Sequence, residues 1–206
     1  MRNASSVQSE WARDVLRGRD QEAALEVIKI LVEEHKRIAE LLSILQAGAD
    51  RIIDNRLPPR AFFEAGLQQA RQYADQAHHF KEEHVLFGAL AQKHNGDLDG
   101  HIERHRFQHE QCRDLLGAVS SALAGYERGK EDAIKAVHRN LTEYVRTLRG
   151  HLRSENENFF PLAQVSLSEA EAKVLLGEFQ SYQAKHPDAE QNLAEGLATM
   201  RGYLDE

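Results

Sequence analysis

A His-x-x-x-Glu pair whose glutamate is followed four residues later by Leu-Phe-Gly or Phe-Phe-Pro occurs twice in this 206-residue chain, and the two copies constrain the fold more than any other feature of the sequence. His78 and Glu82 precede a Leu-Phe-Gly triplet, whereas His151 and Glu155 precede a Phe-Phe-Pro triplet. Residues four apart lie on one face of a helix, one turn from each other. Each pair therefore predicts a helix that presents an imidazole and a carboxylate together, as half of a metal site.

The two pairs belong to a longer internal repeat. His78 and His151 are 73 residues apart, and His35 and His109 are 74 residues apart. This offset relates the first two predicted helices to the third and fourth. Helix pairs related in this way direct their equivalent faces toward the centre of a four-helix bundle. The sequence therefore predicts an all-α fold, an up-down-up-down four-helix bundle with a C-terminal helical extension.

Apolar residues recur at steps of three and four along four segments, which is the spacing of amphipathic helices. These segments predict helices over about 21–53, 59–93, 98–127 and 131–160, and Pro161 is expected to end the last of them. Ser168 and Glu171 then form a predicted capping box before a helix to about 185 and another from about 188 to 204. The predicted domains are a flexible N-terminal arm at 1–19, the bundle at 20–165 and the extension at 166–206.

Charge and composition exclude several classes of partner. The formal net charge of -7 argues against nucleic-acid binding. No apolar run approaches the roughly 20 residues needed to cross a bilayer, and no polybasic face indicates membrane binding. The single cysteine, Cys112, excludes an internal disulfide and suits a reducing compartment, so we expect a cytoplasmic protein. The sequence gives no indication of the oligomeric state.

Several histidines lie on the apolar stripes instead of the polar faces. Together with the two glutamates, the inward-facing set is His35, His78, Glu82, His105, His109, His151 and Glu155. Burying two ionised carboxylates without partners costs several kcal/mol for each of them. Metal ions bound between the carboxylates remove this cost, and imidazole suits iron, copper, nickel or zinc. A buried metal site explains the set better than five separate core histidines.

The choice of inward-facing residues on the second predicted helix leaves an alternative open. His79 and Glu83 repeat the same spacing one residue later, but their row continues through Gln76 and Gln72, so periodicity favours His78 and Glu82 inside. His101, four residues before His105, is a further alternative. We therefore treat His79, Glu83 and His101 as groups that hold the ligands from outside the site, or as alternative ligands. The histidines expected to be solvated are His79, His84, His94, His138 and His186, and Cys112 is expected to be a packed small residue.

These motifs resemble the hemerythrin-like, or HHE cation-binding, domain. The resemblance covers about 21–165 and rests on Glu34-His35, the run from His78 to Phe87, His105 with His109, and the run from His151 to Pro161. It implies two non-haem iron ions joined by an oxo or hydroxo bridge. By position, His35 and His78 would bind one iron, His105, His109 and His151 the other, and Glu82 and Glu155 would bridge both. The chain departs from the family pattern at Gly88, where proline is usual, and Glu155 follows its histidine by four residues instead of the frequent five.

The first iron of such a centre keeps an open position, which the resemblance assigns to O2, peroxide or nitric oxide. We expect a protein for oxygen binding or for redox or oxygen sensing. The alternatives are an enzyme that decomposes peroxide or acts on nitric oxide under stress, and an iron-storage or regulatory bundle. No side chain outside the ligand set is clearly placed as a general acid or base, so the sequence predicts no catalytic residue.

Overall fold

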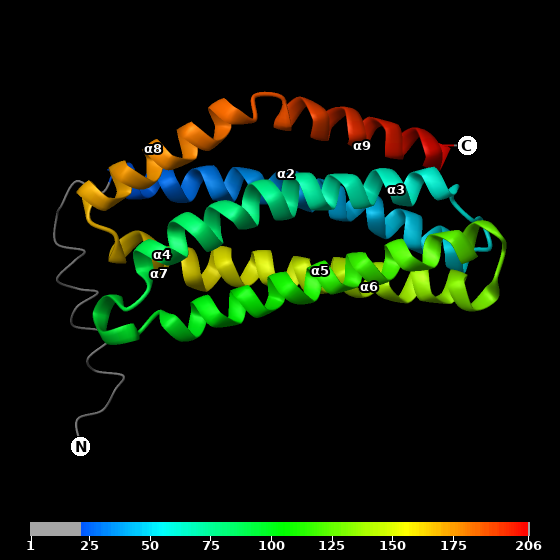
Figure 1. The fold of residues 1–206 in the computed structure, drawn as a ribbon, viewed down its shortest axis with the longest axis horizontal. Helices are drawn as coiled ribbons and strands as arrows, with labels where there is room; N and C mark the ends of the chain where they lie inside the picture. Colours follow the sequence, from blue (N-terminus) through cyan, green and yellow to red (C-terminus); the bar gives the residue numbers. More distant parts are fainter. Residues whose placement is uncertain (1–21, 206) are drawn as a thin grey trace, which may run out of the picture.

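The computed structural model describes residues 22–205, which fold into helices joined by short turns and contain no strand (Figure 1). The α-helices are α2 (Glu22–Ile53), α3 (Arg60–Gln69), α4 (Phe87–Leu90), α5 (Asp99–Glu127), α6 (Glu131–Ser154), α7 (Phe160–Ser166), α8 (Glu169–Lys185) and α9 (Ala189–Asp205). The π-helical stretches are η1 (Ala70–His79), η2 (Glu82–Leu86) and η4 (Glu155–Phe159), and η3 (Lys93–Gly96) is a 3-10 helix. The predicted all-α class is confirmed, and the predicted arm at 1–19 lies outside the described residues.

Four long helical segments run alongside one another in Figure 1: α2, the α3–η1–η2–α4 segment, α5, and the α6–η4–α7 segment. α5 packs along α6, and α2 packs against both α6 and η1. The chain turns at residues with a left-handed backbone, Asn55 (φ 56) after α2 and Gly129 (φ 67) after α5. Asparagine and glycine tolerate this conformation after a helix. The helix starts lie within about two residues of those predicted from the apolar spacing.

The fourth segment does not end at Pro161, as the sequence suggested, but continues through it to Ser166. Proline usually ends a helix because it lacks an N–H group and its ring clashes with the carbonyl four residues earlier. The turn directly before α7 is η4, in which hydrogen bonds connect residues five apart instead of four. This wider turn lets Pro161 occupy the start of α7 without ending the helix.

A polar layer divides the apolar core into two clusters. On α2, one cluster includes Leu31 and the other includes Ile38, and His35 lies between them. On α5, His105 and His109 likewise lie between the residues of the two clusters. The buried imidazoles therefore form a layer across the interior, with apolar packing on both sides.

The two C-terminal helices extend this packing. In Figure 1, α8 runs along α2 and α9 runs along α3. Ser168 and Glu171 form the predicted capping box at the start of α8. Phe179 of α8 belongs to the same apolar cluster as Leu31, so the core is continuous past residue 165. Within the described residues, no helix is long and apolar enough to cross a membrane.

Gly48 on α2 marks a contact that leaves no room for a side chain. A Cβ atom there would lie 2.2 Å from Cε1 of Phe62, whose ring is fully buried. We expect Gly48→Ala to lower the free energy of unfolding by about 1–3 kcal/mol, because the ring must move within a packed core. In Gly177→Ala, a control in α8, no atom lies within 4 Å of the new Cβ, so a gain of about 0.5–1 kcal/mol is expected. Urea unfolding measures both, and equal effects would contradict the prediction.

Candidate metal centre

All seven side chains that the sequence directed inward are buried, and they converge in the polar layer. α2 contributes His35, η1 and η2 contribute His78 and Glu82, α5 contributes His105 and His109, and α6 and η4 contribute His151 and Glu155. Both carboxylates begin a π-helical turn. Such turns are rare and occur frequently at functional sites.

The first group of potential ligands consists of His35, His78, Glu82 and Glu155. The Nε2 atoms of His35 and His78 are 2.9 Å apart, and Nε2 of His78 lies 3.4 Å from Oε1 of Glu82. Nε2 of His35 lies 3.4 Å from Oε2 of Glu155 and 4.0 Å from Oε1 of Glu82. Ligand bonds of about 2.1 Å place neighbouring donors about 3 Å apart and opposite donors about 4 Å apart. These separations fit one ion.

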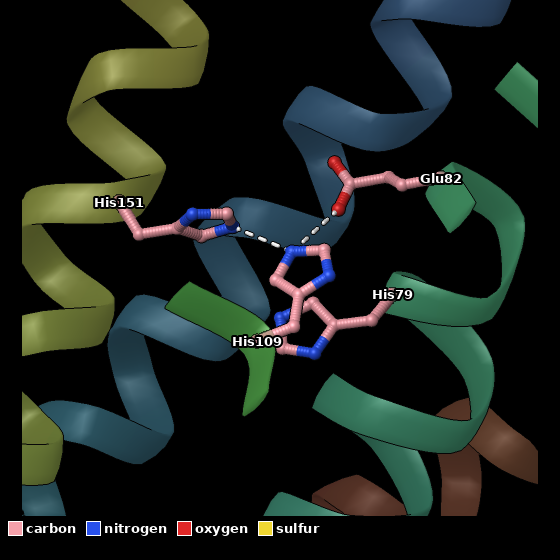
Figure 2. A group of neighbouring side chains, drawn as sticks. All are labelled: His79, Glu82, His109 and His151. Carbon is pink, nitrogen blue, oxygen red and sulfur yellow. Dashed lines mark hydrogen bonds and ion pairs between the residues drawn. The ribbon is translucent and has the colours of Figure 1, made fainter. Parts of the chain in front are cut away.

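The second group consists of His79, Glu82, His109 and His151, shown in Figure 2. Nε2 of His109 lies 3.0 Å from Nε2 of His151 and 3.4 Å from Oε2 of Glu82. The ring of His79 stacks against that of His109, with centroids 3.7 Å apart and an interplanar angle of 12°. The imidazoles come from three different segments and meet beside one carboxylate.

A third group overlaps both of the others. It contains His105, His151 and Glu155, so it shares His151 with the second group and Glu155 with the first. Nδ1 of His105 lies 3.4 Å from Oε1 of Glu155 and 3.3 Å from Nδ1 of His151. The seven predicted ligands therefore form one continuous cluster.

Each buried carboxylate faces two sets of histidines. Oε1 of Glu82 faces His78 and Oε2 faces His109. Oε1 of Glu155 faces His105, and Oε2 lies 3.4 Å from Nε2 of His35 and 3.1 Å from Nε2 of His151. Both side chains are fully buried, and none of the four oxygens has a hydrogen-bond partner among the described residues. An uncompensated buried carboxylate costs several kcal/mol. Cations beside these oxygens would compensate them, so the donor set fits bound metal.

Burial keeps three of the imidazoles in the form that binds metals, whereas at His109 contacts with Glu82 and Glu83 outweigh burial and raise the pKa. Burial lowers the pKa of His79 to about 3 and that of His105 to about 4, and it holds the pKa of His78 well below its ordinary value. A neutral imidazole offers a free nitrogen lone pair to a metal. Burial and the charge of Glu155 raise the pKa of Glu82 to about 8, so without metal this carboxylate holds a proton near neutral pH. A bound cation would replace that proton.

Outer partners fix the orientation of four of the histidines through their Nδ1 atoms. The pairs are His78 with Glu34 (2.9 Å), His35 with Asn156 (2.9 Å), His151 with Gln108 (3.1 Å) and His109 with Glu83 (2.5 Å). Such contacts are typical of metal-binding histidines, because they fix the tautomer and turn Nε2 toward the ion. Nε2 of all four residues faces the cluster, and Nδ1 of His151 also lies 3.3 Å from Nδ1 of His105.

The C-terminal extension contacts Lys81, which binds Glu34, one of these outer partners. Lys81 donates a hydrogen bond to Glu34, and its Nζ atom lies 5.9 Å from the ring centroid of Phe179 and 5.4 Å from that of Tyr182. Glu34 and Lys81 also line a pocket of about 600 Å³ bounded by α2, η1 and the region from α8 to α9. The pocket therefore reaches to within one side chain of His78.

The predicted exposure of His79 is wrong. The sequence placed it in a solvent-facing row with Gln76, but only 2% of its surface is exposed. His78 follows the buried Ala74 by four residues and His79 follows it by five. Because η1 is π-helical, with hydrogen bonds between residues five apart, both imidazoles enter the interior. The 3.6-residue period used for the prediction does not apply to this stretch.

The other two alternatives lie outside the three groups found among the described residues. Glu83 binds His109 from outside the cluster, and His101 packs with its ring 6.2 Å from that of Phe159. Of the remaining histidines predicted to be solvated, His84, His94 and His186 are exposed and His138 is half-buried. Cys112 is packed in the core, as predicted, and burial raises the pKa of its thiol to about 12.

Sequence reasoning missed most of the outer partners. Glu34 and Asn156 directly adjoin ligands in the chain, and adjacent residues on a helix point about 100° apart, so periodicity directed them away from the site. Arg113, which donates hydrogen bonds to Glu83 and Asp75, carried a weak signal, because it follows His109 by one helical turn. Gln108 and Asp75, which contacts Nδ1 of His79, carried none.

Comparisons with known proteins agree with this geometry. Residues 26–163, more than half of the chain, match the model of the hemerythrin HHE cation-binding domain. An uncharacterized protein of Mycobacterium tuberculosis and one of Mycobacterium bovis are each 25% identical over 164 residues, which cover 78% of this chain and 62% of theirs. The chain thus matches less than two thirds of the length of these relatives, and no solved structure matches it significantly. From the family match and the buried His/Glu cluster together, we conclude that the chain belongs to the hemerythrin HHE cation-binding domain family.

Proposed function

We propose that this chain is a non-haem di-iron protein that binds O2 or a related small ligand, for oxygen binding or for redox or oxygen sensing. In this proposal the four long segments form an up-down-up-down bundle at 20–165, and the extension at 166–206 packs on its outside. The bridging carboxylates are Glu82 and Glu155, one ion lies by His35 and His78, and the other lies by His105, His109 and His151. Peroxide and nitric oxide are the related ligands.

One observation carries the proposal: each buried carboxylate lies beside histidines of both proposed ions. Oε1 of Glu82 lies 3.4 Å from His78, and Oε2 lies 3.4 Å from His109. A carboxylate that served a single ion would not need histidines of both sets beside it. Inward carboxylates and histidines from all four helices are typical of di-iron sites in helix bundles.

The surroundings of the cluster support a role for a small ligand. Phe160 stacks on His35 with ring centroids 5.2 Å apart, and Phe159 lies 5.0 Å from the ring of His105. Both phenylalanines and Phe87 are buried, and they exclude bulk water from one side of the cluster. A di-iron centre supplies reversible redox chemistry and a position for an external ligand. The polypeptide fixes the imidazoles and shields them from water.

The histidine-rich composition favours binding over oxygen activation. The predicted set contains five imidazoles and two carboxylates. Carboxylate-rich sets are usual in oxygen-activating di-iron enzymes of the ferritin-like type, which use four glutamates and two histidines. We therefore favour a ligand-binding protein over an oxygen-activating enzyme.

Metal analysis and visible spectroscopy test this proposal directly. We expect about two iron ions per chain and near-ultraviolet charge-transfer bands that change when azide is added, because azide occupies the open position. Evolution of O2 from hydrogen peroxide would indicate an enzyme instead of a binding protein. A single zinc ion, or a folded protein that takes up no metal, would contradict the di-iron proposal.

A further inference from the structure

His79 has every local feature of a metal-binding histidine, although the family pattern does not assign it. Its side chain is 2% exposed, and its Nε2 atom has no hydrogen-bond partner among the described residues. It shares a potential ligand group with Glu82, His109 and His151. A buried imidazole nitrogen without a partner is costly unless something binds it.

The other ring nitrogen of His79 is held from outside. Nδ1 lies 3.4 Å from Oδ1 of Asp75, and Nε of Arg113 donates to the same oxygen at 2.8 Å. Nη2 of Arg113 donates at 2.8 Å to Glu83, which contacts Nδ1 of His109 at 2.5 Å. One guanidinium therefore binds two carboxylates, and each carboxylate orients one imidazole.

The two ring nitrogens of His79 have the same kinds of surroundings as those of His109. In both residues a carboxylate fixes Nδ1, and Nε2 is left for an ion, which is the pattern of ligating histidines. Their rings stack 3.7 Å apart at an angle of 12°, so each ring limits the rotation of the other. A solvated or purely structural histidine does not require an oriented, unpartnered Nε2 in the interior.

We propose that His79 is a sixth histidine ligand of the centre, which binds the second ion together with Glu82, His109 and His151. This inference rests on metal binding as proposed above and concerns which side chains bind the second ion. His79 and His105 belong to different groups that share His151. The second ion therefore has two available positions, one on the His79 side and one on the His105 side of His151.

The test is titration of the metal-free full-length chain with Co2+, whose visible absorption depends on the number and type of its ligands. We expect His79→Leu to weaken binding of the second ion at least about 100-fold, since loss of an outer partner alone weakens metal binding about 10–100-fold. Asp75→Ala removes the group that orients His79 and one of the two carboxylates that hold Arg113, while Glu83 still contacts His109, so an intermediate loss of about 10-fold is expected. His101→Leu is the matched control, because His101 is a half-buried histidine outside the three groups.

Several outcomes separate this inference from the proposed function. If the unaltered chain binds no Co2+, the proposed function fails and the assignment of His79 fails with it. If the chain binds two ions and His79→Leu binds them with unchanged affinity and spectrum, only the assignment of His79 is overturned. Circular dichroism of each metal-free variant monitors folding. If His79→Leu is not folded, the spectrum of Asp75→Ala decides: a spectrum like that of the unaltered chain overturns the assignment.

Discussion

Replacing Glu82 with leucine is expected to abolish binding of both metal ions and to stabilise the metal-free protein. Glu82 belongs to the first and second ligand groups, so its removal takes a donor from both ions. Without metal, its two oxygens are buried and have no hydrogen-bond partner among the described residues. A buried polar group without a hydrogen-bond partner costs about 1–3 kcal/mol, and an apolar residue of similar volume removes this cost. Metal content and urea unfolding in the presence of a chelator measure the two effects.

The two effects have opposite signs, which makes the result diagnostic. A residue that only supports packing would lower stability without metal when replaced. Glu83→Gln is the matched control, because Glu83 contacts His109 from outside the cluster and is only partly buried. Its replacement should keep two ions and weaken their binding about 10–100-fold. If Glu82→Leu retains two ions while Glu83→Gln loses them, Glu83 is the ligand, and the choice of Glu82 as the metal-binding glutamate of this segment is wrong.

Lowering the pH from 7 to 5 is expected to release the metal and to lower the free energy of unfolding of the metal-free protein. Burial depresses the folded-state pKa of His79 to about 3 and of His105 to about 4, and it also depresses that of His78. Below about pH 6.5 the unfolded chain therefore binds protons that the folded chain does not. Stability is fully present above that pH and is lost as the pH falls toward these folded-state values. In the metal-bound protein, protons also compete with the ions for the imidazoles.

Glu82 acts in the opposite direction but does not reverse the result. Its raised pKa of about 8 means that the folded chain takes up a proton between about pH 8 and 4.5, which favours the folded state as the pH falls. His109, whose contacts with Glu82 and Glu83 outweigh its burial and raise its pKa, also favours the folded state as the pH falls toward 6.5. Below pH 6.5 His109 is protonated in both states, and the three depressed histidines outweigh the single carboxylate. Urea unfolding at pH 7.5, 6 and 5 measures the slope, and a chromophoric chelator measures metal release. His84→Gln, which alters an exposed histidine, should leave the slope unchanged. Equal or greater stability at pH 5 would refute the prediction.

The helices were predictable because their apolar spacing is a local property. The periodicity placed His35 between Leu31 and Ile38 on an inward stripe, and the structure buries all three side chains. The heptad spacing along α5 identified His105 and His109 as buried for the same reason. The repeat of 73 residues added that the helix faces that carry these histidines and glutamates meet in the interior. The inward set of seven residues therefore followed from the sequence.

The same reasoning failed where the helix departs from its usual period. It placed His79 in a polar row and ended the fourth helix at Pro161, and both errors lie in or beside π-helical turns. A π-helical turn adds one residue between hydrogen-bonded positions, so every later side chain changes its direction. The apolar spacing of the sequence does not mark where this extra residue is inserted.

The sequence by itself determined the helical segments and the buried histidines and carboxylates, because these depend on spacing within single helices. Only the tertiary structure decided which groups surround them: Asp75 and Glu83 lie beside Arg113, Glu34 lies beside His78 and Lys81, and His79 lies beside His109. Those contacts join residues from different helices or depend on π-helical turns. Their positions result from how the helices pack, and packing depends on the whole chain instead of any one segment.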